Sequence, residues 1–227
     1  MSALAPEHRL PAVGSPEAPI EIEVYYDFLC PYAYEAAVWL ERAKAELGDG
    51  LRVTWRAFPL EQVNADPDLG PDWKLWEQPL DADHQGLLAL RAAAAAAEQG
   101  DDAFARFHRQ VMELRHGQQR TLTRRPSLLR AAAQAGLDLA RFERDLDDDA
   151  LAARIGADYA HGQAEHGVFG TPTFVTPDGD SVYVQVRPAP EPADAVPLLL
   201  EVLGIARQRP NVREIKRTKR PAPPEAV

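Results

Sequence analysis

The segment from residue 20 to residue 57 constrains the fold most, because it predicts a strand, a helix and a second strand in immediate succession. Residues 20–26 (IEIEVYY) alternate with a period of two and become wholly apolar or aromatic at their end, which predicts a half-buried strand that finishes buried. Residues 51–57 (LRVTWRA) alternate in the same way. A helical crossover between two strands favours parallel pairing, so we expect an α/β sheet.

The helix between these strands is expected over residues 31–47, where small and apolar side chains recur at alternating spacings of four and three. Pro31 suits its first position, because proline has no backbone N–H to leave unpaired there. Gly48 and Gly50 supply the stop. Cys30 is therefore expected at or next to the N-cap of this helix, directly after the first strand.

The middle of the chain changes character, since β-branched residues become rare and alanine dominates, with an unbroken alanine run over 92–97. The breaks in this region fall at Pro79, at Gly100, around 117–125 and at Gly136. They divide it into four or five helices, the last of which starts at the acidic residues 147–149 and runs to Gly162. We expect residues 61–166 to form a helical insertion.

After the insertion, residues 168–176 (VFGTPTFVT) predict a short buried strand entered through Pro172. Residues 177–180 form a turn and residues 182–186 alternate again, so a hairpin is expected. A final helix follows over 194–203. The expected halves of the α/β domain are residues 20–60 and 167–205.

The two ends of the chain are expected to lie outside this core. Residues 1–19 form a proline-rich N-terminal arm without the features of an export signal, and the basic residues 206–227 form a flexible tail that is too polar to bury. We therefore expect a cytoplasmic protein. Among 227 residues the net charge is -10, and there is no apolar run of membrane-spanning length, so neither nucleic acid nor membrane is an expected partner.

Cys30 is the only cysteine, which excludes an intramolecular disulfide and a Cys-rich zinc site. A lone cysteine often behaves as a small buried hydrophobe. At a strand-to-helix junction, however, the first amides of the helix are unpaired and its dipole is partly positive, so a thiolate is stabilised there. This position favours a reactive thiol at Cys30. Asp27, three residues earlier, is either a strand-end cap or a proton carrier for that thiol.

A Thr171-Pro172 pair opens the predicted late strand, where proline is tolerated. Taken alone, this pair would be expected to have a trans peptide bond. The five histidines of the helical region form no pair at a spacing of four, so we expect no metal site and solvated rings. They are His84, His108, His116, His161 and His166.

Two segments together point to a known family. Residues 27–34 (DFLCPYAY) resemble the active-site segment of DsbA-family thioredoxin-like proteins, especially the cytosolic branch of FrnE-like oxidoreductases and 2-hydroxychromene-2-carboxylate isomerase-like proteins, where the usual pattern is D-F-x-C-P-W-C-Y. Residues 167–175 (GVFGTPTFV) resemble the cis-proline segment of that family. The resemblance covers residues 20–204 and implies a thioredoxin-like α/β fold, with a central mixed sheet of about four strands and a large all-helical insertion.

The resemblance also implies a function and a site. It predicts a thiol-disulfide oxidoreductase with Cys30 as the catalytic residue, Pro172 in the cis form beside it, and the backbone of Thr171 available to an extended substrate or a thiol ligand. Tyr34 would either line this site or serve in core packing. The implied substrate-binding residues are Phe28, Pro31, Tyr32, Tyr34, Thr171 and Pro172.

The chain departs from the family pattern at Ala33, where a second cysteine usually stands. A dithiol cycle within one chain is therefore impossible, and a mixed disulfide at Cys30 must be resolved by glutathione or another low-molecular-weight thiol. We expect no tightly bound cofactor, a protein or small-molecule disulfide or thiol as substrate, and either a monomer or a homodimer. Two alternatives stay open: a glutathione-type thiol-dependent isomerase or transferase, and a non-catalytic binding or chaperone module.

Overall fold

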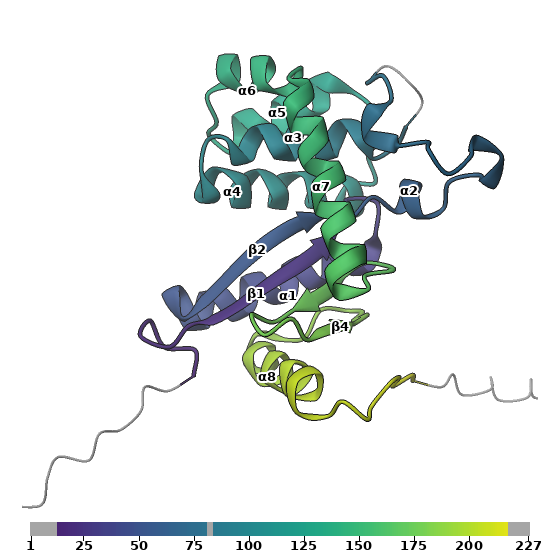
Figure 1. Ribbon diagram of the computed structural model, residues 1–227. Coiled ribbons are helices and arrows are strands. Elements are labelled where there is room, and N and C mark those ends of the chain that lie inside the picture. The colour runs from purple at the N-terminus through teal and green to yellow at the C-terminus, as the bar shows by residue number, and fades with distance from the viewer. Residues whose placement is uncertain (1–12, 81–83, 218–227) are drawn as a thin grey trace, which may run out of the picture.

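The computed structural model describes residues 13–80 and 84–217, and a four-stranded mixed sheet lies at its centre (Figure 1). The strands are β1 (Ile20–Tyr26), β2 (Leu51–Ala57), β3 (Thr173–Val175) and β4 (Ser181–Tyr183), in the order β2-β1-β3-β4. β1 and β2 pair in parallel, with Ile20 opposite Leu51, whereas β1 with β3 and β3 with β4 are antiparallel. The predicted mixed sheet with a parallel opening unit is confirmed.

The opening strand-helix-strand unit has the predicted bounds. The helix α1 (Pro31–Leu47) joins β1 to β2 through a 3₁₀ turn at Gly48–Gly50. Gly48 has a φ of 55°, a conformation that glycine adopts at little cost. The burial of β1 also follows the prediction, since its last three residues are all buried. Each of these features depends on a local pattern, which is why the sequence predicts them well.

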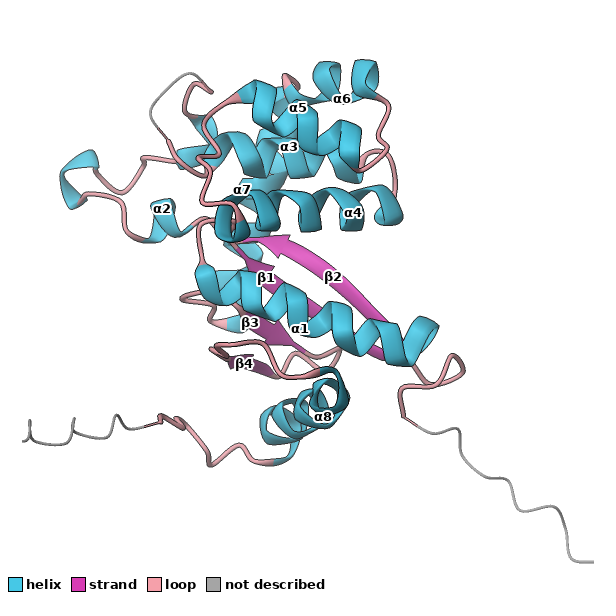
Figure 2. Cartoon of the chain, turned by 180° about the vertical axis from the view of Figure 1, so that it is seen from behind, coloured by secondary structure: helices cyan, strands magenta, loops and turns pink. Residues whose placement is uncertain are grey.

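One face of the sheet packs against α1 and α8 (Pro192–Gln208). In Figure 2, which views the molecule from the side opposite to Figure 1, α1 lies in front of the sheet. Ile22, Val24 and Phe174 of the strands are buried in this apolar layer. Trp39 of α1 is fully buried there, and its indole N–H donates to the carbonyl oxygen of Ala195 in α8 at 2.7 Å. The two helices are thus joined to each other as well as to the sheet.

The helical insertion stacks beyond the C-terminal ends of β1 and β2 (Figure 1). Its helices are α2 (Leu60–Val63), α3 (Leu87–Ala97), α4 (Asp101–Met112), α5 (Arg125–Gln134), α6 (Leu139–Leu146) and α7 (Asp149–His166), with short 3₁₀ turns at Pro67–Leu69 and Leu75–Glu77 and a π-helical turn at Glu113–Gly117. The alanine run lies in α3, which is buried on most sides because alanine permits close helix packing. Phe107 and Phe142 meet in this core, with ring centroids 5.3 Å apart.

The last helix of the insertion, α7, crosses the opposite face of the sheet (Figure 1). Asp148 caps its start by accepting the N–H of Ala150. The helix runs past Gly162, where we predicted its end, and finishes before Gly167, which has a φ of 61°. Gly162 serves packing instead, because a Cβ there would lie 2.6 Å from a ring carbon of Tyr25 in β1. The glycine therefore lets α7 approach the sheet closely.

The second half of the sheet confirms the hairpin but has shorter strands than predicted. Strand pairing, rather than alternation, sets their length. Directly after β4, the N–H of Val184 donates to the carbonyl of Pro172 at 3.2 Å. In contrast, α8 is longer than predicted, so residues 206–208 are helical and not part of a tail. Arg207 pairs there with Asp178 at 2.6 Å.

The outermost parts of the predicted arm and tail, residues 1–12 and 218–227, lie outside the described residues. No helix within residues 13–80 and 84–217 is long and apolar enough to cross a membrane.

Candidate functional site

The candidate site lies at the junction between the end of β1 and the start of α1. Cys30 is the N-cap residue of α1, and its N–H donates to the carbonyl of Asp27 at 3.1 Å. The N–H of Tyr34 in turn donates to the carbonyl of Cys30 at 3.2 Å, which closes the first helical turn. Cys30 itself is only 5% exposed. The thiol is thus held at the positive end of the helix dipole, as the sequence predicts.

The sulfur of Cys30 contacts Thr171, a residue from the second half of the chain. The Cys30 Sγ donates to the carbonyl oxygen of Thr171 at 3.3 Å, across 141 positions of sequence. The Thr171–Pro172 peptide bond is cis. Thr171 and Pro172 are both buried, and the hydroxyl of Thr173 donates to the carbonyl of Gly170 at 2.8 Å. The carbonyl of Thr171 therefore faces the thiol in this structure rather than solvent.

Asp27 lies three residues before Cys30 and is buried. One carboxylate oxygen accepts the N–H of Leu29 at 2.8 Å and the other accepts the N–H of Leu60 at 2.6 Å. Asp27 therefore caps two backbone segments, which is one of the two roles considered for it. Burial raises its pKa to about 6, although the two backbone N–H groups act in the opposite direction.

The π-helical turn of the insertion braces the site. His116 Nε2 donates to the carbonyl of Phe28 at 2.8 Å, and its ring stacks on Tyr34 with centroids 5.2 Å apart. The hydroxyl of Tyr34 donates to Glu113 at 3.1 Å. Burial lowers the pKa of His116, although its hydrogen bond to the Phe28 carbonyl acts in the opposite direction. His116 is half-buried, whereas its sequence alone suggested a solvated ring, and Glu113 carries no signal of its own, because π-helical turns often occur at functional sites but have no sequence signature.

The structure buries two side chains of this region. The ring of Phe28, an expected substrate-binding residue, is fully buried and makes edge contact with Tyr26, with ring centroids 5.1 Å apart, so in this structure it supports the turn from inside. His108 is 3% exposed rather than solvated, and packs between Trp55 and the ring of Phe28. Burial lowers the pKa of His108 to about 3, so the ring stays neutral.

Aromatic side chains flank the thiol on the outer side. Pro31 and Tyr32 are half-buried at the start of α1. Tyr183 of β4 pairs with Phe169, with ring centroids 5.0 Å apart, and Phe169 is 66% exposed. The pKa of Tyr183 is raised mainly by burial and further by the charges of Cys30 and Tyr32. Sequence reasoning missed Tyr183, since alternation alone only marks it as outward-facing.

The sequence comparisons agree with the two motifs. Residues 21–196 match the family model of the DSBA-like thioredoxin domain. An uncharacterized protein of Mycobacterium tuberculosis is 28% identical over 213 residues, which cover 91% of this chain and 85% of that protein. A Na⁺/H⁺ antiporter NhaA of Herminiimonas arsenicoxydans is 31% identical over 167 residues, but these cover 71% of this chain and only 21% of the antiporter. The chain thus spans about a fifth of that relative.

Solved structures show the same fold. A thioredoxin-like oxidoreductase from Silicibacter pomeroyi is 26% identical with a TM-score of 0.53, covering 84% of this chain and 92% of that one. The cytosolic disulfide reductase DsbM from Pseudomonas aeruginosa, solved with GSH, is 24% identical with a TM-score of 0.57, covering 81% and 99%. A 2-hydroxychromene-2-carboxylate isomerase is 18% identical with a TM-score of 0.56, covering 86% and 100%.

Proposed function

Because the chain belongs to the DsbA-like thioredoxin domain family, we propose that it is a thiol-disulfide oxidoreductase that acts through Cys30 alone. The observation that carries this proposal is the sulfur of Cys30 at the N-cap of α1, 3.3 Å from the carbonyl of the cis Thr171–Pro172 peptide. No other cysteine occurs among the 227 residues, so every covalent step must use this sulfur.

In the first step, the Cys30 thiol loses its proton to solvent and the thiolate attacks one sulfur of a substrate disulfide. A Cys30–sulfur bond forms while the substrate S–S bond breaks, and the second substrate sulfur leaves as a thiolate with the electron pair. The unpaired amides at the start of α1 stabilise the attacking thiolate. The hydrogen bond from the Cys30 thiol to the Thr171 carbonyl is lost in this step, because a thiolate has no proton to donate.

In the second step, an external thiol resolves the mixed disulfide. Ala33 stands where a resolving cysteine would be one helical turn from Cys30, and it carries no thiol. An outside thiolate therefore attacks the substrate sulfur, forms a new disulfide with it and returns Cys30 as a thiolate. Glutathione is the co-reactant that we propose, and the DsbM structure solved with GSH supports it. The cytosolic assignment of DsbM also supports a cytoplasmic location.

We place substrate against Pro31, Tyr32, Tyr34 and the Thr171–Pro172 segment. Cys30 is 5% exposed, so little of its side chain is open to solvent. This geometry favours a small disulfide or an extended peptide, which can present one sulfur without a broad contact surface. Phe169 and Tyr183 would give such a substrate its apolar contacts.

Intact-mass measurement after incubation with glutathione disulfide tests this proposal. We expect one glutathionyl adduct on the wild-type chain, reversed by excess dithiothreitol, and none on Cys30→Ser. Ala33→Cys is the sharpest comparison, because its new thiol can attack the adduct and replace it with an internal disulfide. Persistence of the adduct in Ala33→Cys would place residue 33 out of reach of Cys30.

The same incubation, together with a binding measurement on the wild type and on Cys30→Ser, separates the alternatives. A wild-type chain that binds glutathione reversibly, with no covalent adduct at any concentration of the disulfide, contradicts the oxidoreductase and favours a thiol-dependent isomerase or transferase. A chain whose substrate binding is unchanged in Cys30→Ser favours a non-catalytic binding or chaperone module.

A further inference from the structure

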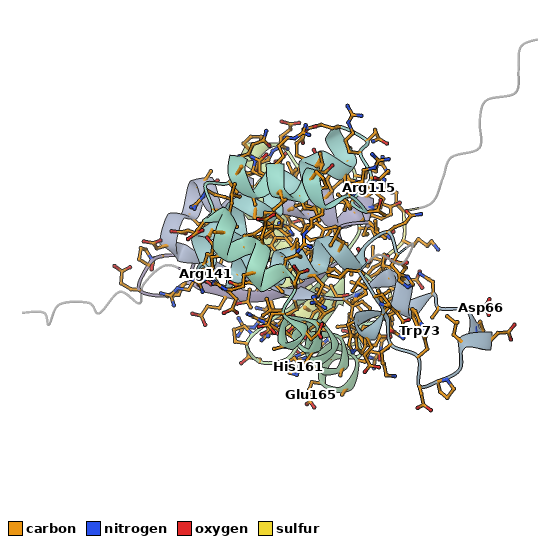
Figure 3. The ribbon with its side chains drawn as sticks, turned by 90° about the horizontal axis from the view of Figure 1, so that it is seen from above. Asp66, Trp73, Arg115, Arg141, His161 and Glu165 are labelled. Carbon is orange, nitrogen blue, oxygen red and sulfur yellow. The ribbon has the colours of Figure 1, made fainter. Side chains whose placement is uncertain are left out.

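A second group of reactive side chains lies on the face of the sheet that α7 covers. Glu23 comes from the middle of β1, and His161 and His166 come from the C-terminal end of α7, where Figure 3 labels His161 beside Glu165. The atoms with which these three residues can ligate a metal ion lie within 4.8 Å of one another. Cys30 is not one of them.

The packing of α7 on the sheet builds this group. Gly162 lets the helix end lie against the ring of Tyr25, the residue two positions after Glu23. The carbonyl of Gly162 accepts the N–H of Val168 at 2.9 Å, which closes the helix end. The hydroxyl of Ser181 donates to the carbonyl of His166 at 3.0 Å. The helix end is therefore held by both β1 and β4, and the two histidines stay above Glu23.

The ligand atoms are available for a metal. Arg56 donates to Glu23 at 2.6 Å and 3.2 Å, and both contacts go to Oε1, which leaves Oε2 for another partner. Hydrogen bonds of this kind commonly orient a carboxylate that ligates a metal. Within the described ranges, Nδ1 of His166 is buried and has no hydrogen-bond partner. A buried nitrogen without a partner costs stability, so it marks a group that is missing its ligand or its water.

The group also faces open space. A cavity of about 510 Å³ is lined by Glu23, His161 and His166, together with Thr176 and other residues of the strands. The hydroxyl oxygen of Thr176 is a second buried atom without a partner among the residues that the structure describes. The cavity therefore has room for a water molecule on the open side of a bound ion, and it has a polar group that such water could meet.

We propose that Glu23, His161 and His166 bind one Zn²⁺ ion, with water as its fourth ligand. Imidazole nitrogen and carboxylate oxygen are ligands that zinc accepts, whereas Mg²⁺ and Ca²⁺ prefer oxygen alone. A tetrahedral ion with bonds of about 2.0–2.2 Å holds its ligand atoms about 3.4 Å apart. The atoms lie within 4.8 Å of one another at present, so binding requires the side chains to rotate toward the ion, and we expect exposed His161 and half-buried Glu23 to do so.

This site differs from the sequence expectation of no metal ligands among the histidines. That expectation rested on spacing, since two histidines share a helix face at a spacing of four. His161 and His166 are five positions apart, but the second is the last residue of α7, and the third ligand comes from β1. The site depends on helix–sheet packing and is independent of the function proposed for Cys30.

Calorimetric titration of the full-length chain with ZnCl₂, after removal of metal by a chelator, tests the proposal. All variants carry Cys30→Ser, so that the thiol cannot bind zinc. We expect one Zn²⁺ per chain and no binding of MgCl₂. Both His161→Ala and Glu23→Gln are expected to weaken zinc binding by at least about 10-fold. His84→Ala is the matched control, because His84 also contacts a carboxylate, that of Glu61 at 3.1 Å, but lies outside the group.

Thermal unfolding supplies a second readout. Zinc that binds the folded chain raises the melting temperature of the Cys30→Ser chain and of the His84→Ala control, and at the same zinc concentration it raises that of His161→Ala less. His161 is exposed, so its variant is expected to melt like the parent chain when zinc is absent. Failure of the parent chain to bind zinc, or unchanged zinc affinity in His161→Ala, overturns the proposal.

Discussion

The two faces of the central sheet come from the same strands but differ in their chemistry. The face toward α1 and α8 is apolar, and Val24 and Phe174 are both fully buried against Trp39 there. The face toward α7 carries charge, since Arg56 pairs with Glu23 at 2.6 Å and with Asp158 at 3.1 Å. The helix α1 covers the first face with a continuous apolar layer, whereas the second face combines a smaller apolar cluster around Tyr25 and Val175 with charged side chains and a cavity.

The two faces therefore contribute differently to the stability of the folded chain. Burial of apolar surface is non-directional and stabilises the first face whatever the detailed pairing of its side chains. On the second face, the Tyr25 hydroxyl, His166 Nδ1 and the Thr176 hydroxyl are buried without partners among the described residues. Such atoms cost stability. We infer that the α1 face contributes more to the stability of the fold than the α7 face does.

The largest expected effect is on the apolar face. Trp39→Ala removes a fully buried indole and its hydrogen bond to Ala195, and we expect it to lower the free energy of unfolding by about 3–5 kcal/mol. Urea denaturation monitored by circular dichroism measures this loss. Trp39→Phe keeps most of the apolar volume and should lose less. A loss below about 1 kcal/mol in Trp39→Ala would mean that this face does not dominate stability.

The next effect concerns Asp27, which follows β1 directly and is 1% exposed. Its pKa is raised from 3.8 to about 6, mainly by burial, so the folded chain holds this proton more tightly than the unfolded chain does. The stabilisation that comes from the protonated Asp27 side chain is therefore fully present below pH 3.8, the pKa of an unperturbed aspartate. It is lost as the pH rises through about 6, the pKa of Asp27 in the folded chain. We expect a loss of about 2 kcal/mol between about pH 4.5 and pH 7.

Urea denaturation of the wild type and of Asp27→Asn across this pH range isolates that contribution. The free energy of unfolding of the wild type minus that of the variant should fall as pH rises, because the variant cannot ionise at residue 27. A difference that does not change with pH would show that Asp27 titrates alike in the folded and unfolded chains.

The smallest effect tests the contact of α7 with the sheet. In Gly162→Ala the new Cβ meets the Tyr25 ring at 2.6 Å. We expect a net loss of about 1 kcal/mol, because overpacking exceeds the gain in helix propensity. Gly204→Ala in α8 is the matched control. A Cβ there meets nothing within 4 Å, so that variant should gain roughly 0.5–1 kcal/mol. Equal gains in both variants would contradict the close approach of α7.

The bounds of helices and strands were predicted correctly where they depend on neighbouring residues. They were predicted less well where they depend on pairing with a distant strand. The bounds of β1, α1 and β2 follow from alternation, Pro31 and the glycines after α1. β3 and β4 are shorter than their alternating sequences, because the ends of a strand depend on where its partner stops. At the site, the thiol and the Thr171–Pro172 segment come from recognisable motifs, whereas His116 and Tyr183 reach it from other elements without any sequence signal.

The sequence by itself determined the α/β architecture, the helical insertion and the placement of a lone thiol at a helix start, since periodicity, proline, glycine and cysteine act over a few neighbouring residues. Only the tertiary structure decided which polar groups meet. His116 reaches the carbonyl of Phe28, and the two histidines of α7 reach Glu23, because helices pack onto particular faces of the sheet. The contacts of that packing join residues far apart in the chain, and no local pattern encodes them.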